Sequence, residues 1–188
     1  MKFSNFLSLA CLSLAAAVPT KRSTTYFGLS LPTQDIRTNL DNSFSSNVPP
    51  FFQKLQSTNR VQSSFHVTLI HVTDSKSHSD IWKYYKDLVA KGGVTQVPVQ
   101  LNHIVWDDRL MAVDVTVDPE GTSGVQWPST NDVTHTTIGT VNKSVKPVES
   151  NDLLVQWKSD GSVIGINDSG VSAISMQNAR VVGTLTAF

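Results

Sequence analysis

Cysteine is almost absent from this chain of 188 residues. The only cysteine, Cys11, lies in an uncharged N-terminal stretch that we expect to be removed, so the mature protein should contain no disulfide bond. The same absence excludes a cysteine nucleophile and a cysteine-ligated zinc site. The sequence also lacks a Gly-x-Ser-x-Gly motif, which argues against a serine hydrolase of the α/β type. No His-Glu-x-x-His pair occurs, and we expect neither a metal nor a cofactor.

Long apolar runs and excess charge are missing as well. Beyond the N-terminal stretch no run is long enough to span a bilayer, so we expect no contact with a membrane. The chain has 15 basic and 15 acidic residues, and removal of residues 1–22 would leave a formal charge of −3. An acidic protein does not bind a long nucleic-acid duplex through counterion release. A small nucleotide or a single RNA end remains a suitable partner.

The N-terminus has the features of a secretory signal peptide. Lys2 precedes an apolar stretch that ends in small residues, so residues 1–17 are predicted to direct secretion and to be cleaved. In a secreted protein, sequons for N-glycosylation mark surface turns. Asn142 and Asn167 each begin such a sequon and are the candidate sites for a glycan.

A dibasic pair, Lys21 and Arg22, follows the predicted cleavage site. It fits either the end of a short pro-segment, residues 18–22, or an ordinary charged pair. The remaining chain, residues 23–188, has about 165 residues, which is enough for one domain with a substantial core.

Hydrophobic periodicity predicts more strands than helices, and several strands are neighbours in sequence. This order favours an α+β fold over a doubly wound one. The clearest helix is amphipathic, with apolar residues at helical spacing and two glycines after it. We expect strands at 24–31, 61–72, 95–106, 109–117, 133–141, 162–166 and 179–186, and helices at 34–40, 51–55, 81–89 and 147–158.

Two predicted strands contain the same short motif, His-x-Thr followed by an aliphatic residue. His66 and Thr68 form the first copy, and His135 and Thr137 form the second, 69 positions later. Alternate residues of a strand share a face, so each histidine should lie beside its threonine. A single copy would be uninformative, but two copies in aliphatic strands suggest two half-sites that face each other.

Such a pair of half-sites is suited to acid–base chemistry on a phosphate. One histidine removes a proton from water while the other protonates the leaving oxygen. The two threonine hydroxyls are placed to donate to the non-bridging phosphate oxygens, where charge develops.

Other residues are weaker candidates. His71 lies five positions after His66, which places it on the opposite face of a regular strand and suggests a structural role. Tyr26 and Trp106 are candidates for stacking on a nucleobase, although aromatic residues at such positions also serve as core.

The motifs and their surroundings resemble the two-histidine (2H) phosphoesterases. The branch that they resemble most is the cyclic phosphodiesterase domain of fungal tRNA ligase, here as a secreted stand-alone form. The resemblance covers most of the mature chain and is specific around the motifs. It rests on the segments 26–29, 65–71, 81–85, 135–140 and 144–154.

The resemblance implies a bilobal α+β fold, in which two antiparallel sheets face each other across a central cleft with helices outside. It implies hydrolysis of a 2′,3′-cyclic phosphate, on a nucleotide or an RNA 3′ end, to a 2′-phosphate. His66 and His135 would be the catalytic pair, and Thr68 and Thr137 would bind the phosphate of the substrate. The protein would act as a monomer.

A second interpretation stays open. Companion kinase and adenylyltransferase parts are not seen in the sequence and a signal peptide is predicted, so a role in tRNA splicing is not expected. The chain could instead be a secreted binding protein or effector that keeps the fold without the activity of the tRNA ligase domain.

Overall fold

The computed structural model describes residues 23–45, 47–166 and 170–188. The predicted signal peptide, the pro-segment and the sequon at Asn167 lie outside the described residues. The elements, in chain order, are β1 (Tyr26–Leu31), α1 (Thr33–Phe44), α2 (Pro50–Ser57), β2 (Phe65–His71), η1 (Val72–Asp74), α3 (Ser79–Ala90), β3 (Gln96–Trp106), β4 (Leu110–Val117), β5 (His135–Thr140), η2 (Pro147–Glu149), α4 (Ser150–Ser159), β6 (Gly165–Ile166) and β7 (Ser172–Ala187).

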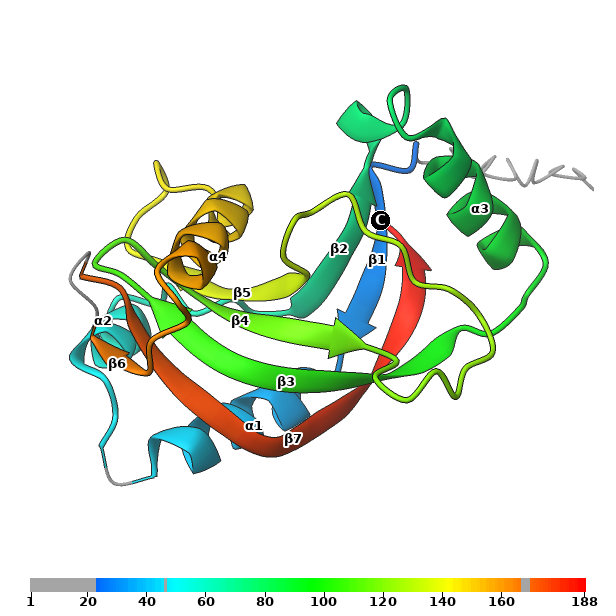
Figure 1. Cartoon of the computed structure of the whole chain (residues 1–188). Coiled ribbons are helices and arrows are strands. Elements are labelled where there is room, and N and C mark those ends of the chain that lie inside the picture. The colour runs from blue at the N-terminus through cyan, green and yellow to red at the C-terminus, as the bar shows by residue number, and fades with distance from the viewer. Residues whose placement is uncertain (1–22, 46, 167–169) are drawn as a thin grey trace, which may run out of the picture.

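The strands form one antiparallel sheet in the order β2-β1-β7-β3-β4-β5, with β6 paired to β7. The sheet curls strongly, so its two edge strands, β2 and β5, contact each other (Figure 1). The predicted α+β class is confirmed. The two facing halves are, however, the two ends of a single sheet rather than separate sheets, because the long strands β3 and β7 run through both halves.

The bend in these long strands has a local cause. Leu101 pairs with Ala179, but His103 pairs with Ser175, so the register of β3 against β7 shifts between the two pairs. Asn178, inside the shifted segment, has a positive φ of 54°. Such irregularities bend a strand and increase its twist, which lets one sheet turn back on itself.

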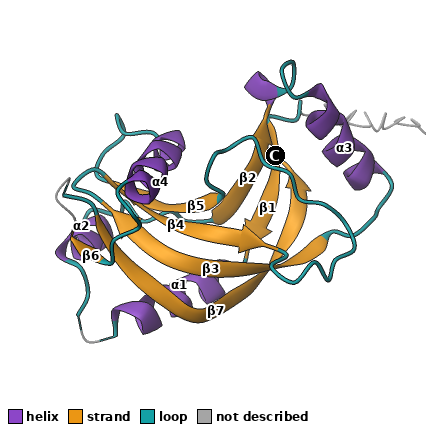
Figure 2. Ribbon diagram, in the orientation of Figure 1, coloured by secondary structure: helices purple, strands orange, loops and turns teal. Residues whose placement is uncertain are grey.

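Helices cover the sheet in several places (Figure 2). In α1, Ile36, Leu40 and Phe44 recur every four residues and are buried against the larger hydrophobic core. In α4, Leu154 and Trp157 belong to a second, smaller core together with Leu110 and Ala112 of β4. No helix in the described part of the chain is long and apolar enough to cross a membrane.

Candidate active site

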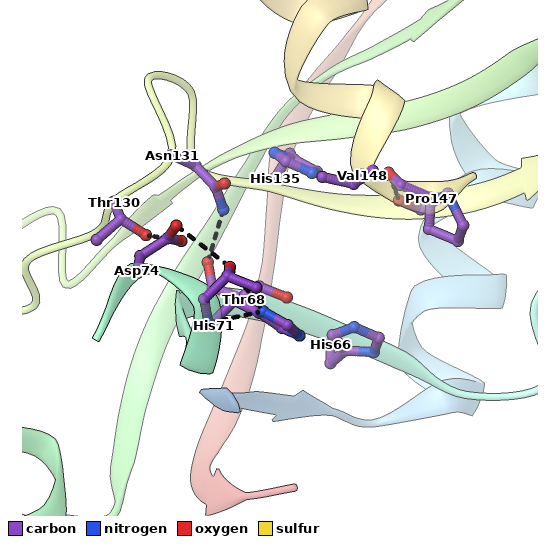
Figure 3. A pocket seen from close by; sticks show the side chains of 11 residues that line it. His66, Thr68, His71, Asp74, Thr130, Asn131, His135, Pro147 and Val148 are labelled. Carbon is purple, nitrogen blue, oxygen red and sulfur yellow. Dashed lines mark hydrogen bonds between the residues drawn. The ribbon is translucent and has the colours of Figure 1, made fainter. Parts of the chain in front are cut away.

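The two His-x-Thr motifs lie at opposite ends of the sheet and line one cavity of about 470 Å³ (Figure 3). His66 and Thr68 come from β2, and His135 and Thr137 come from β5. The curl of the sheet therefore brings together residues that are far apart in sequence. The complete lining is His66, Thr68, His71, Thr73, Asp74, Thr130, Asn131, His135, Thr137, Pro147 and Val148.

His135 is held in a defined tautomer. Its Nδ1 lies 2.7 Å from the carbonyl oxygen of Val133, which can only accept, so Nδ1 carries the proton. The neutral ring therefore has an unprotonated Nε2. The residue is only 8% exposed, and this burial lowers the pKa of the ring, while the Val133 carbonyl opposes the shift.

His66 is half-buried on the opposite side of the cavity. Burial lowers its pKa, and the charge of a protonated His135 lowers it further. No hydrogen bond to the His66 ring is found within the described residues, whereas its faces contact aromatic rings. The ring centroids of Tyr26 and Phe188 lie 5.1 and 5.6 Å from that of His66.

The two threonines differ in their surroundings. The Thr137 hydroxyl donates to the carbonyl of Pro147 at 3.2 Å or shares a proton with the Ser150 hydroxyl at 2.9 Å. The Thr68 hydroxyl has no hydrogen-bond partner in the part of the chain that the structure describes. Thr68 can therefore donate to a ligand directly, whereas Thr137 must give up a partner or accept only.

Each motif is followed by one extra residue in the ladder. Phe27 pairs with Ile70 and Gly28 with Thr68, so Leu69 has no partner on β1. On β5 the extra residue is Ile138, because its neighbours Thr137 and Gly139 pair with consecutive residues of β4. The carbonyls of these two bulge residues accept from neighbouring segments, Leu69 from the Thr130 amide at 2.9 Å and Ile138 from the Gln62 amide at 2.8 Å.

The first bulge overturns the prediction for His71. On a regular strand, His71 would lie on the face opposite His66. The extra residue, Leu69, changes the parity, and His71 lines the same cavity as His66 and Thr68. Gly28 permits this arrangement, because a Cβ at that position would collide with the carbonyl oxygen of Val67 on β2.

The segment between β4 and β5 supplies a wall of the cavity that the sequence did not reveal. The Asn131 side-chain amide donates to the Thr68 carbonyl at 3.0 Å, next to the Thr130 contact with β2. Two tyrosines of α3 fix the same segment, since Tyr84 donates to the Gln126 carbonyl at 2.9 Å and Tyr85 to the Pro128 carbonyl at 2.7 Å. Sequence alone showed only a polar linker ahead of the second motif.

A family model described as the fungal tRNA ligase phosphodiesterase domain matches residues 13–185. The chain belongs to this family. It is 29% identical over 161 residues to tRNA ligase 1 of Schizosaccharomyces pombe, a match that covers 83% of this chain and 20% of the relative. The chain thus spans about a fifth of the length of that curated relative.

A solved structure described as a fungal RNA kinase has the same fold as this chain. The superposition has a TM-score of 0.62 at 23% identity, and it covers 89% of this chain and 46% of that chain. Membership of the family supports an enzyme of the phosphoesterase kind.

The two residues that were predicted to stack on a nucleobase, Tyr26 and Trp106, lie far apart in this phosphodiesterase domain. Tyr26 lies beside His66 and stacks on Phe188, with ring centroids 4.4 Å apart. Trp106 does not join the cavity, because it stands at the far end of the long strand β3. There it lines a separate, shallow hollow with Phe51 and Lys54. Within the described residues, no cluster of three or more His, Cys, Asp or Glu side chains is placed to hold a metal ion.

Proposed function

We propose that this protein is a 2′,3′-cyclic phosphodiesterase that leaves a 2′-phosphate and a free 3′-hydroxyl. The observation that supports this most directly is the single cavity lined by His66, Thr68, His135 and Thr137 from the two ends of the sheet. The reaction needs no metal or cofactor, because both proton transfers are assigned to histidines. All four side chains come from one chain, so a monomer is sufficient.

The reaction divides the two proton transfers between the two sides of the phosphate. One histidine, in its neutral form, takes a proton from water as the water oxygen attacks phosphorus. The bond between phosphorus and O3′ breaks, and the other histidine, in its protonated form, gives its proton to O3′. The Thr68 hydroxyl donates to a non-bridging oxygen as charge develops there.

The natural substrate is proposed to be a nucleotide or the 3′ end of an RNA that carries a cyclic phosphate. The family relationship to tRNA ligase is consistent with an RNA end. A free nucleotide also suits a cavity of about 470 Å³, which is within the range of small-molecule sites.

Turnover by variants tests this function. Purified protein in EDTA should hydrolyse nucleoside 2′,3′-cyclic phosphates and an oligoribonucleotide with the same terminus, giving only 2′-phosphates by ³¹P NMR. His66→Ala and His135→Ala should each lower kcat/KM by about 10²- to 10⁴-fold, since each removes one proton transfer. His78→Ala is the matched control, because His78 is exposed and outside the cavity.

Two results would contradict the proposal. Activity that survives both substitutions would rule out the histidine pair as acid and base. Absence of turnover on every cyclic substrate, with the protein folded, would favour the alternative of a binding protein or effector.

We also propose that the protein is secreted and that Asn142 carries a glycan. Asn142 is exposed at a turn in which its side-chain oxygen accepts from the amides of Ser144 and Val145. Pro147 and Val148, a few residues further along, line the cavity, so a glycan would lie near its rim. Expression in a eukaryotic host should release a protein whose mass falls on treatment with an N-glycosidase, and Asn142→Gln should abolish the part of that change due to this site.

A further inference from the structure

Three histidines line the cavity, but the proposed reaction uses only two. The third, His71, is the last residue of β2, and the bulge at Leu69 turns it toward the cavity. Figure 3 shows His66, Thr68 and His71 following one another along β2. With the extra residue discounted, His71 is one alternate position beyond Thr68, about 7 Å along the strand.

The contacts of His71 determine where its proton lies. The backbone amide of Thr73 donates to His71 Nδ1 at 3.2 Å. A backbone N–H can only donate, so Nδ1 must be an acceptor and the neutral ring must carry its proton on Nε2. The Thr73 hydroxyl lies 2.9 Å from the same Nδ1 and, with Nδ1 as an acceptor, donates its single proton there rather than to Asp74 at 3.3 Å.

This tautomer is the opposite of the one that the structure gives His135. His135 keeps its proton on Nδ1 for the Val133 carbonyl and has an accepting Nε2. His71 uses Nδ1 as an acceptor and has a donating Nε2–H. The two rings therefore offer complementary groups, an acceptor suited to proton transfer and a donor suited to holding a negatively charged oxygen.

Asp74, three residues after His71, lies near two hydroxyl groups of the protein. Asp74 lines the cavity, but its two oxygens lie 3.3 Å from the hydroxyls of Thr73 and Thr130. The Thr130 hydroxyl can donate to the carboxylate, so its charge is partly satisfied by the protein. The Thr68 hydroxyl and the His71 Nε2–H are among the donors on this side of the cavity that have no partner within the described residues.

We propose that His71 is a substrate-binding residue that donates its Nε2–H to a phosphate oxygen of the substrate. This inference rests on the proposed function for the identity of the ligand. The oxygen belongs either to the cyclic phosphate or, in an RNA, to the phosphodiester on the 5′ side of the terminal nucleotide. His71 takes no part in proton transfer.

Two substitutions separate this role from a purely structural one. In His71→Asn, the side-chain oxygen replaces Nδ1 and can still accept from the Thr73 amide, but the donor at Nε2 is lost. In His71→Gln, the side-chain nitrogen replaces Nε2 and can still donate, but the acceptor for Thr73 is lost. The first variant keeps the turn and the second keeps the proposed substrate contact.

KM is the quantity that should respond. Loss of one hydrogen bond to a charged oxygen should raise KM about 10- to 100-fold in His71→Asn, with kcat much less affected and the melting temperature near that of wild type. His71→Gln should keep a KM closer to wild type even where its melting temperature falls. An effect on nucleoside and oligonucleotide substrates alike indicates the cyclic phosphate, and an effect on the oligonucleotide alone indicates the 5′ phosphodiester.

A wild-type KM in His71→Asn on both substrates would overturn the proposal. So would losses of activity in the two variants that simply follow their losses of thermal stability.

NMR tests the contact without turnover. In protein labelled with ¹⁵N, long-range ¹H–¹⁵N spectra should show His71 as the Nε2–H tautomer, and its Nε2 signal should shift on titration with a nucleoside 2′-phosphate. A protein that binds this ligand through His71 but hydrolyses no cyclic phosphate would refute the proposed function alone. A His71 signal that stays unchanged while those of His66 and His135 move would refute this inference alone.

Discussion

The acidity of the two facing histidines is set by their burial. Both pKa values are lowered from the ordinary value of about 6.5, since an uncompensated charge is costly away from water. The charge of a protonated His135 lowers the pKa of His66 further. The free protein therefore has both histidines neutral at pH 7 for most of the time.

This shift predicts an acidic pH optimum for kcat/KM. The base must be neutral, so activity falls as the pH drops through its pKa. The acid must be protonated, so activity falls as the pH rises through its pKa. Because both values lie below about 6.5, the maximum should lie on the acidic side of that value. Rates at low substrate concentration between about pH 4.5 and 8 measure the profile, and a maximum above neutrality would contradict the assignment of both shifts.

The bulges after the two motifs explain where reasoning from the sequence succeeded and where it failed. Parity was correct for His66 with Thr68, because these residues precede the extra residue, and it failed for His71, which follows it. The adjacent apolar residues Leu69 and Ile70 break the alternation, but such a pair also occurs in a strand that is buried on both faces, so the break alone does not identify a bulge. The presence of Gly28 in the adjacent predicted strand was the available signal, since it indicated a close approach of two backbones.

Gly28→Ala tests the coupling between β1, the bulge and the site. The added Cβ would collide with the backbone carbonyl of Val67, so β1 and β2 must separate and move His66 and Thr68. We expect a loss of unfolding free energy of about 1–3 kcal/mol, together with a drop in activity larger than the stability loss explains. Chemical denaturation and kinetics on the same samples measure both quantities.

Gly93→Ala is the control for this substitution. Its added Cβ would collide with the end of the flexible Leu88 side chain, which can move aside, and would be at ordinary contact distance from the Leu88 carbonyl oxygen. It should leave activity unchanged. If Gly28→Ala were equally harmless, the close approach of the two strands would not be what shapes the site.

At the scale of the whole molecule, the α+β class and the facing motifs could be predicted from the sequence, but the continuity of the sheet could not. The strand prediction began only at residue 179, whereas β7 starts at Ser172 and continues to Ala187. Two exposed polar residues, Gln177 and Asn178, interrupt the alternation at the register shift and resemble a turn. Only pairing with β3 on both sides of the shift shows that one strand passes through it.

A ligand that bridges the two ends of this sheet should stabilise the whole fold. The motifs are 69 positions apart, so the unfolded chain cannot present His66 and His135 to one phosphate. Binding to the folded state alone adds about 2.7 kcal/mol at a ligand concentration 100 times Kd. For a domain of this size, that corresponds to a rise in melting temperature of roughly 5–10 °C. Calorimetry with a nucleoside 2′-phosphate measures the rise.

The variants show whether this stabilisation depends on both ends of the sheet. His66→Ala on β2 and His135→Ala on β5 should each reduce the rise, since each removes the contact from one side of the cavity. His78→Ala should keep it in full, because His78 is exposed and lies outside the cavity. A rise that is lost in only one of the two site variants would mean that the ligand contacts one end of the sheet, and the cavity would then not act as a single phosphate site.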